Sequence, residues 1–499
     1  MKIFSILKVI IFSFLQFPLV VLGFPSSSTM AHGDQKVQFI LLQVNDVYEL
    51  LPVKGEGGLA RLATLKKQLI AENPNTYMVL SGDVLSPSAL GTAQIDGGRL
   101  HGKQMIDSFN HVGLDFATLG NHEFDLKLEE VQQRLTESKT TWVISNATDA
   151  QGHLFLHTRK NDMLKIIDTD QEFIHVGFFG VMLNSNTKDY VRYTDVLTTA
   201  RQQVSELSSQ VEMIIAITHL RVEQDQQLAK QEPQISLILG GHEHNHMAIE
   251  VGPRLPKIYK ADANARSAYI HRITYHLDTH KSEIQSELKR LTADIPEDQE
   301  VAKVVNHWVK LAYEGFRKEK FEPDSVVAHI PIPLDGLERS VRFHSTELTK
   351  LIAETMRLAM NRTELSFFNG GFIRIDDVLP PGPLTHYDII RTLPFREIIV
   401  SIEMKGSLLK KVLDTGQQEI GHGGDLHTAG GSFRENNWLI NDQPLDLNRI
   451  YRVATNGFLL TGKETGLEFF NRHHPELKVI ETGPDLRQAL IAEIQRRYK

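Results

Sequence analysis

The sequence of 499 residues contains no cysteine. This absence excludes disulfide bonds, thiolate metal ligands and cysteine nucleophiles. There is also no polybasic run, and the formal net charge of −8 gives no indication of binding to nucleic acid or to an anionic membrane. What is present is a globular composition, with 41% hydrophobic and 23% charged residues, and a length typical of two or three domains.

Beyond the N-terminus, the chain lacks an apolar segment long enough to span a bilayer. At the N-terminus, two lysines precede an apolar stretch over residues 9–21, and residues 21–23 supply a plausible cleavage site. We therefore expect residues 1–23 to be a cleaved signal peptide, and the mature protein to be exported, either periplasmic or secreted. The alternative is a membrane anchor, which Gln16, Pro18 and the shortness of the run disfavour. No stable membrane anchor is then expected after cleavage.

Short apolar runs alternate with helix-like stretches from about residue 36 to 292. Most runs are continuously apolar, which favours strands buried on both faces and therefore an α/β layered domain. Residues 57–73 place leucines at helical spacing and are followed by Asn73-Pro74 as a stop. The predicted strands are residues 37–44, 77–81, 115–119, 142–145, 175–181, 211–218 and 235–241.

The pattern changes near Pro296. Residues 296–322 start with this proline at a first-turn position, continue with acidic residues, and place valines and Trp308 on one apolar stripe. We predict that this segment is a helix linking two domains. The second unit, residues 323–499, contains a predicted helix around 346–360, glycine-rich turns, short strands and a closing amphipathic helix.

Five of the apolar runs are followed directly by Asp, Asn or His. In an α/β sheet the carboxyl ends of the strands line the ligand crevice. Carboxylate, amide and imidazole groups at that edge are the ligand set for one or two divalent metals. Each turn alone is also explained as an ordinary turn or a solvated loop, but chance would have to repeat at five strand ends. The residues are Asn45-Asp46, Gly82-Asp83, Gly120 to Asp125, His219, and His242 to His244.

These motifs, in this order, resemble a known family. Residues 37–271 resemble the metallophosphoesterase domain of the exported 5′-nucleotidases and UDP-sugar hydrolases, through QVNDVYE, GGLARLATL, SGD, LGNHEFD, ITHL and GGHEHNH. More weakly, GGFIR, LPF and RVATNGF look like the family's C-terminal domain. The resemblance implies a four-layer α-β-β-α sandwich with a calcineurin-like fold over residues 36–292, followed by the linker helix and a smaller α+β substrate-binding domain that rotates to deliver phosphate.

The resemblance also implies two divalent metal ions, although the motifs do not distinguish Zn, Mn, Mg, Fe and Co. Such a pair of cations clamps phosphoryl oxygens and activates a water as nucleophile near neutral pH. Asp83 is the implied bridging ligand, Asp46 and His244 would bind the first ion, and Asn121, His219 and His242 the second.

His122 and Asp125 lie three residues apart in the same motif as Asn121. This spacing suits a pair in which the carboxylate fixes the imidazole tautomer and raises its basicity. In the family such a dyad stabilises the transferring phosphoryl group or helps the leaving oxygen. The alternative is a metal ligand or a structural pair, and we favour the catalytic dyad because Asn121 already fills the ligand position. Glu123 is expected to support the loop, and His246 to be either solvated or next to a ligand.

The first motif departs from the family pattern, in which both residues of Asp-any-His bind metal. This chain has Asp46-Val47-Tyr48. Strand alternation is expected to aim residue 48 the same way as residue 46, but a phenol, with a reference pKa of about 10, is a poor ligand before deprotonation. Three outcomes are open: water takes that position, Tyr48 binds as phenolate, or the first site binds weakly. NDVYE recurs in a branch of this superfamily, so it does not indicate a dead enzyme.

In the C-terminal domain, Arg374 is the best match to a substrate-binding arginine, because its planar fork grips phosphate oxygens. A surface arginine in a turn is the alternative. Asn369 and Gly371 are expected to bring backbone donors close. Phe458 matches one of two rings that hold the base in relatives, unless it is a core residue. The other ring corresponds to Leu426, and GKETG replaces the family's GGDG, which weakens the case for purine stacking.

Together these features predict an exported, metal-dependent phosphohydrolase, foremost a 5′-nucleotidase acting on nucleoside monophosphates. One alternative is a UDP-sugar diphosphatase or a hydrolase of 2′,3′-cyclic nucleotides or other phosphoesters. A further alternative is a catalytically inactive binding protein whose metal site has decayed. The expected partner is a small-molecule phosphate ester, and neither a nucleic acid polymer nor a protein partner is expected.

Overall fold

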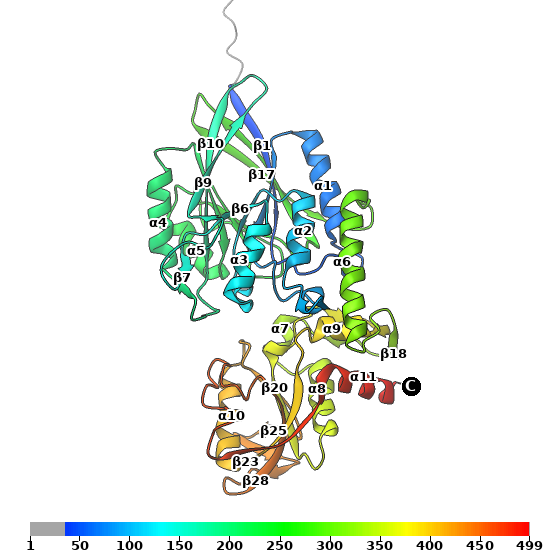
Figure 1. The fold of residues 1–499 in the computed structure, drawn as a ribbon. Helices are drawn as coiled ribbons and strands as arrows, with labels where there is room; N and C mark the ends of the chain where they lie inside the picture. Colours follow the sequence, from blue (N-terminus) through cyan, green and yellow to red (C-terminus); the bar gives the residue numbers. More distant parts are fainter. Residues whose placement is uncertain (1–34, 499) are drawn as a thin grey trace, which may run out of the picture.

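The computed structural model describes residues 35–498, which form two lobes joined along one side by a long helix (Figure 1). The predicted signal peptide at residues 1–23 lies outside these residues. Within residues 35–498, no helix has both the length and the apolar character needed to cross a membrane.

Two mixed β-sheets pack face to face in the first lobe. One sheet contains, in spatial order, β17 (Lys281–Arg290), β16 (Ser267–His276), β1 (Lys36–Val44), β2 (Thr76–Ser81), β5 (Phe116–Thr118), β6 (Thr141–Val143) and β8 (Thr158–Arg159). The other contains β14 (Met247–Ile249), β15 (Lys257–Lys260), β13 (Leu237–Gly240), β12 (Met213–His219), β10 (Phe173–Met182) and β9 (Asn161–Ile167). Neighbouring strands β1, β2 and β5 are parallel, as are β10, β12 and β13, so their carboxyl ends share one edge.

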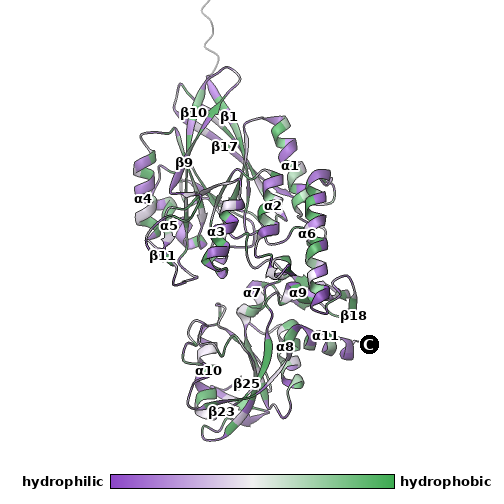
Figure 2. Ribbon diagram, in the orientation of Figure 1, coloured by the Kyte–Doolittle hydropathy of each residue, from purple (hydrophilic) through white to green (hydrophobic). Residues whose placement is uncertain are grey.

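Helices cover both outer faces, which makes four layers. The core between the sheets is apolar, and the rings of Phe116 and Phe178 stack across it with centroids 4.3 Å apart. The helices show both colours in Figure 2, which fits helices with one buried face. The predicted α/β sandwich is confirmed. The covering helices are α1 (Leu59–Glu72), α2 (Lys103–Val112) and α3 (Leu128–Glu137) on the first sheet, and α4 (Val196–Leu207) and α5 (Val222–Gln231) on the second.

The helix between the lobes is α6 (Gln299–Lys318), and it starts later than predicted. Asp298, and not Pro296, marks its beginning, because the Asp298 carboxylate accepts a hydrogen bond from the Val301 N–H at the helix N-terminus. Its apolar stripe packs against α1 and α2, and the Trp308 indole N–H donates to Asp107 in α2 at 2.8 Å. The segment is therefore part of the first lobe's outer layer as well as a connection.

The second lobe contains a mixed five-stranded sheet with helices on both faces. Helix α8 (Glu347–Ala359) packs on one face, and α10 (Gly406–Gln418) on the other. The chain ends in α11 (Leu486–Arg497), which packs beside α8 (Figure 1). The strands, in spatial order, are β24 (Leu426–Ala429), β20 (Leu365–Asn369), β28 (Ile450–Asn456), β23 (Ile398–Lys405) and β29 (Leu477–Asp485).

A buried polar cluster connects the two lobes beside α6. Glu49, which follows β1 and is 8% exposed, accepts hydrogen bonds from the Tyr387 hydroxyl at 3.1 Å and from Arg391 Nε at 3.2 Å. Both partners lie on α9 (His386–Thr392) of the second lobe. This contact holds the second lobe next to the carboxyl ends of the strands of the first.

Candidate active site

The six predicted metal ligands lie at the shared carboxyl edge of the two sheets. Each sits in the turn after a parallel strand, or on the last residue of one, so the topology brings residues up to about two hundred positions apart to one place. The residues are Asp46 after β1, Asp83 after β2, Asn121 after β5, His219 at the end of β12, and His242 and His244 after β13.

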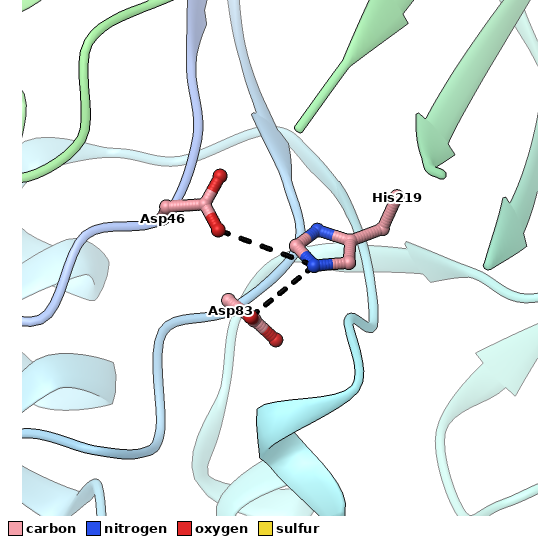
Figure 3. Close-up of side chains that lie close together, drawn as sticks. All are labelled: Asp46, Asp83 and His219. Atoms are coloured by element: carbon pink, nitrogen blue, oxygen red, sulfur yellow. Dashed lines mark ion pairs between the residues drawn. The ribbon is translucent and has the colours of Figure 1, made fainter. Parts of the chain in front are cut away.

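Three of these side chains form a tight, buried cluster. Asp46, Asp83 and His219 each place one possible ligand atom within 4.8 Å of the others, and Figure 3 shows them pointing toward one another. His219 Nε2 lies 3.2 Å from Asp83 Oδ2 and 4.0 Å from Asp46 Oδ1. All three side chains are at most 1% exposed.

The other three predicted ligands surround this cluster. Asn121 Oδ1 lies 3.2 Å from His219 Nε2, and the His242 ring centroid lies 5.3 Å from that of His219. On the other side, His244 Nε2 lies 3.6 Å from Asp46 Oδ1. The arrangement therefore has one group around His219 and another around Asp46, with the Asp83 carboxylate within reach of the first.

Tight turns place these short side chains. Asp46, Asp83 and His242 all have left-handed backbone φ angles, of 52°, 58° and 80°. Such angles are costly for residues other than glycine and cluster at functional sites. Gly120 is needed for close approach, because a Cβ at this position would overlap the Asp83 carboxylate.

The electrostatics of the cluster favour a bound cation. Within residues 35–498, neither Asp46 nor Asp83 forms an ion pair with lysine or arginine, and the ion-pair partners that they do have are histidines. Burial lowers the pKa of His219, but Asp83 and Asp46 outweigh it and raise this pKa to about 9. Burial and the neighbouring His219 lower the pKa of His242 to about 3, which keeps its ring neutral and able to ligate. Buried carboxylates with facing imidazoles and an amide oxygen fit a divalent metal.

Tyr48 reaches the cluster by a different route from the one predicted. Strand β1 ends at Val44, so strand alternation does not apply to residues 46 and 48, and a loop carries the phenol into place. Its hydroxyl lies 3.2 Å from Asp46 Oδ1 and 3.1 Å from Asp83 Oδ2. Burial, with the two carboxylates, raises the Tyr48 pKa well above 10, so the phenol is a neutral hydrogen-bond donor between two proposed ligands.

We predict that Tyr48→His raises metal affinity at one of two sites, by roughly tenfold or about 1.4 kcal/mol, because imidazole is a better neutral ligand than a phenol. Calorimetric titration of metal-free protein with Mn²⁺ measures this. Tyr48→Phe is the matched control, because it removes the hydroxyl without supplying a ligand. Unchanged stoichiometry and affinity in Tyr48→His would refute the prediction.

The structure brings the predicted dyad together beside this cluster. His122 Nδ1 lies 2.8 Å from Asp125 Oδ2, and the His122 backbone N–H donates to Asp83 Oδ1 at 2.8 Å. Burial lowers the pKa of His122, but Asp125 and Asp83 outweigh it and raise the pKa above its ordinary value. Asn186, which the sequence did not single out, donates to Asp125 Oδ1 at 2.9 Å and helps to hold this carboxylate.

Glu123 and His246 take supporting and peripheral positions. The fully buried Glu123 carboxylate accepts from four backbone N–H groups, those of Asp83, Val84, Leu85 and Gly120, at 2.6–3.1 Å. It therefore holds the two loops that carry Asp83 and Asn121. The His246 side chain is 46% exposed and pairs with Asp262 at 3.0 Å, away from the cluster.

Two charged residues of the second lobe contact the site directly. Arg374 Nη1 lies 3.4 Å from His122 Nε2, so the predicted arginine faces the dyad. Asp376 Oδ2 lies 2.6 Å from His244 Nδ1, the ring nitrogen away from Asp46. Sequence reasoning missed Asp376, although its position two residues beyond the end of the GGFIR motif was a usable signal.

Arg342 was also missed. It follows α7 (Glu338–Val341), is 6% exposed, and pairs with Glu338 at 3.2 Å, while its Nη1 has no hydrogen-bond partner among the described residues. Glu464 of the GKETG loop lies close enough for Arg374 and Arg342 both to lower its pKa, against a larger rise from burial. Arg374 and Arg342 thus both stand near one end of this interlobe site, and nothing in the local sequence pattern marked Arg342.

The remaining predicted substrate residues are engaged within the second lobe. The Gly371 N–H donates to the Gly423 carbonyl at 2.8 Å, so it does not offer the expected free donor. Asn369 Nδ2 donates to Glu464 at 2.7 Å. Phe458 is half-buried against the apolar core beside α10, and its backbone N–H donates to Glu397 at 3.2 Å.

A second ring lies near Arg374. Phe395 of the LPF motif has its ring centroid 5.6 Å from Arg374 Cζ, and it is two residues from Glu397, the partner of Phe458. Leu426 instead packs against Gly416 of α10, where any added Cβ would overlap it. Phe395 is therefore an aromatic side chain close to the arginine, Glu397 links its segment to Phe458, and Leu426 packs against α10.

The fold and the site define a two-domain metallophosphoesterase. Residues 39–246 match the family model for the calcineurin-like phosphoesterase domain, and residues 326–472 match that for the 5′-nucleotidase C-terminal domain. The chain belongs to the 5′-nucleotidase family through both matches, with the calcineurin-like phosphoesterase domain first and the 5′-nucleotidase C-terminal domain second.

Relatives cover nearly the whole chain at low identity. The chain is 23% identical to the 5′-nucleotidase of Bos taurus over 492 residues, which covers 85% of this chain and 83% of that protein. Its fold is similar to a 5′-nucleotidase precursor from Thermus thermophilus (TM-score 0.76, 21% identity, 92% of this chain and 97% of the other). It is also similar to the sulfate thiohydrolase SoxB of the same genus (TM-score 0.68, 14% identity, 94% and 95%). The fold alone therefore leaves the substrate open.

Proposed function

We propose that this protein is an exported 5′-nucleotidase that releases phosphate from nucleoside monophosphates with the help of two divalent metal ions. The observation that carries the proposal is the buried cluster of Asp46, Asp83 and His219, faced by Arg374 of the second lobe. Export rests on the signal-like pattern of residues 1–23.

The proposed donor groups would be shared between two ions. We assign Asp83 as the bridging ligand, with Asp46 and His244 on one ion, and Asn121, His219 and His242 on the other. Bound there, the ions would polarise the phosphoryl group and lower the pKa of water for its attack. Asp376 would hold the His244 ring in the orientation and tautomer that present Nε2 to the first ion, through its 2.6 Å contact with Nδ1.

The side chains of this chain would then orient and stabilise the phosphate. Asp125 holds His122 Nδ1, which leaves Nε2 directed at the space near Arg374. There His122 would donate a hydrogen bond to the phosphoryl group or to the leaving oxygen, which catalyses as charge develops in the transition state. Arg374 and Arg342 would bind the phosphate oxygens, because guanidinium groups make charge-assisted hydrogen bonds to them.

For the rest of the substrate, we assign the base to the region of Phe458 and Phe395. The alternatives are a UDP-sugar diphosphatase, and a hydrolase of 2′,3′-cyclic nucleotides or of another phosphoester. They share the metal cluster and differ only in what the second lobe binds. A decayed, non-catalytic binding protein is disfavoured because the six proposed metal ligands and both dyad residues are present in the sequence, although Tyr48 replaces the histidine of the first motif.

The test is phosphate release from AMP, UMP, UDP-glucose and bis-p-nitrophenyl phosphate by Mn²⁺-reconstituted protein, with and without EDTA. We expect AMP or UMP to be the best substrates and EDTA to abolish turnover, since metal removal takes away the main source of transition-state stabilisation. Added Mn²⁺ should restore it. Preference for UDP-glucose or for the bis-ester would move the assignment to an alternative, and no metal-dependent turnover on any substrate would contradict catalysis.

A further inference from the structure

A fully buried lysine lies behind the histidine side of the cluster. Lys260 is the last residue of β15, and its side chain is 0% exposed. An ammonium group is among the costliest groups to bury, so it must be held by several partners. Here it forms an ion pair with Asp225 of α5 at 2.7 Å and another with Glu243.

Lys260 and Asp225 contact the residues directly before and after two proposed ligands, His219 and His242. Lys260 Nζ donates to the Leu220 carbonyl at 2.7 Å, the residue after His219. It also donates to the Gly241 carbonyl at 2.8 Å, the residue before His242.

The remaining neighbours complete the pattern. The Thr218 hydroxyl, just before His219, donates to Asp225 at 2.6 Å. Glu243, just after His242, pairs with Lys260 and accepts from the Val222 N–H at 2.9 Å. None of these contacts involves the imidazole of His219 or of His242.

We propose that Lys260 and Asp225 are positioning residues that hold the loops of His219 and His242 in the spacing needed to bind one divalent metal. This rests on the proposed function of the site. The two loops follow the neighbouring parallel strands β12 and β13, whose pairing ends at Thr218 and Gly240. Beyond it, the Gly241 N–H donates to the Thr218 carbonyl at 2.9 Å, and the Lys260–Asp225 pair adds the side-chain contacts that join the two loops. The His242 backbone, at φ 80°, is in a conformation that a non-glycine residue keeps only when its surroundings enforce it. Lys260 contributes to that enforcement through the adjacent Gly241 carbonyl, together with the Asp46 carboxylate, which accepts a hydrogen bond from the His242 N–H at 2.9 Å.

Any buried lysine can stabilise the fold, so the test must separate an effect on metal binding from a general loss of stability. It therefore compares Lys260 with another buried lysine of the same domain. Lys66 of α1 is the matched control: it is 6% exposed, donates to the Gly113 carbonyl and pairs with Asp115 at 2.8 Å, in the same domain but away from the cluster. Lys66→Met therefore removes a buried ammonium of the same kind without touching the loops of the histidines.

The main variant is the double substitution Lys260→Met with Asp225→Asn. It removes the charges of Lys260 and of the fully buried Asp225 together, which leaves only the Glu243 carboxylate, 22% exposed, without its partner, and it keeps an acceptor for Thr218. Mn²⁺ affinity is measured by calorimetry on metal-free protein, thermal unfolding gives Tm without metal, and the visible spectrum of the Co²⁺-loaded protein reports coordination geometry. We expect about 10–100-fold weaker affinity at one of two sites and an altered Co²⁺ spectrum. Lys66→Met should bind Mn²⁺ as the wild type does, even where its Tm falls.

The proposal is overturned if the double variant keeps wild-type affinity and spectrum, or if the two variants lose affinity in step with Tm. If the double variant does not fold, Asp225→Asn alone gives the same comparison with a smaller expected loss, and no loss there overturns the proposal. If the wild type itself binds no Mn²⁺, the proposed function fails as well, which separates the two failures.

Discussion

Asp83→Asn is expected to remove metal binding and to lower kcat/KM for the best phosphate ester by roughly 10³-fold or more. Asp83 lies at the centre of the cluster, 3.2 Å from His219 Nε2 and next to the Tyr48 hydroxyl, and it is 1% exposed. The amide keeps the shape of the side chain but loses the negative charge that a pair of cations needs. If metal ions supply several kcal/mol of transition-state stabilisation, at about 1.36 kcal/mol per factor of ten, their loss accounts for this effect.

Elemental analysis after gel filtration, together with kcat/KM, measures both parts of the prediction. Asp115→Asn is the matched control, since Asp115 stands before β5 of the same sheet and pairs with Lys66 instead of the cluster. Asp115→Asn should retain the wild-type metal content. Two equivalents of metal bound to Asp83→Asn, or turnover within tenfold of wild type, would show that Asp83 is not the bridging ligand.

His122→Ala is expected to lower kcat by about 10²–10⁴-fold while metal content stays unchanged. The side chain contacts Asp125 and faces Arg374, and only its backbone N–H touches Asp83, an interaction that alanine retains. The loss should fall on kcat more than on KM, because the hydrogen bond from Nε2 is needed mainly as charge develops on the phosphoryl or leaving oxygen.

Steady-state kinetics with the substrate identified in the panel, and metal analysis of the same preparation, test this. His246→Ala is the control, because His246 also pairs with an aspartate, Asp262, but its side chain is 46% exposed. We expect near-wild-type kcat for His246→Ala. Normal turnover in His122→Ala would remove the dyad from the mechanism, and a simultaneous loss of metal would make His122 a ligand or a structural residue instead.

Much of the first domain was predictable because its strands are buried on both faces. A continuous apolar run such as β12 can be recognised as a buried strand from its own residues alone. The short turns after such runs carry polar side chains, which are not expected in an apolar core. The start of α6 at Gln299 was not predicted, because Pro296 and Asp298 are both good local signals for a helix N-terminus. Only the hydrogen bond from the Val301 N–H to the Asp298 carboxylate decides where the helix begins.

The sequence by itself determined the α/β class, the order of the strands that end in polar groups, and the kinds of donor atoms available, since all of these depend on local periodicity and residue chemistry. Only the tertiary structure decided that Tyr48 enters between Asp46 and Asp83, that Asp376 of the second lobe holds His244, and that Lys260 joins the loops of two histidines. These are contacts between segments as much as 132 residues apart, as for His244 and Asp376. They depend on turn geometry and on the packing of one domain against the other, which no periodicity within a single segment encodes.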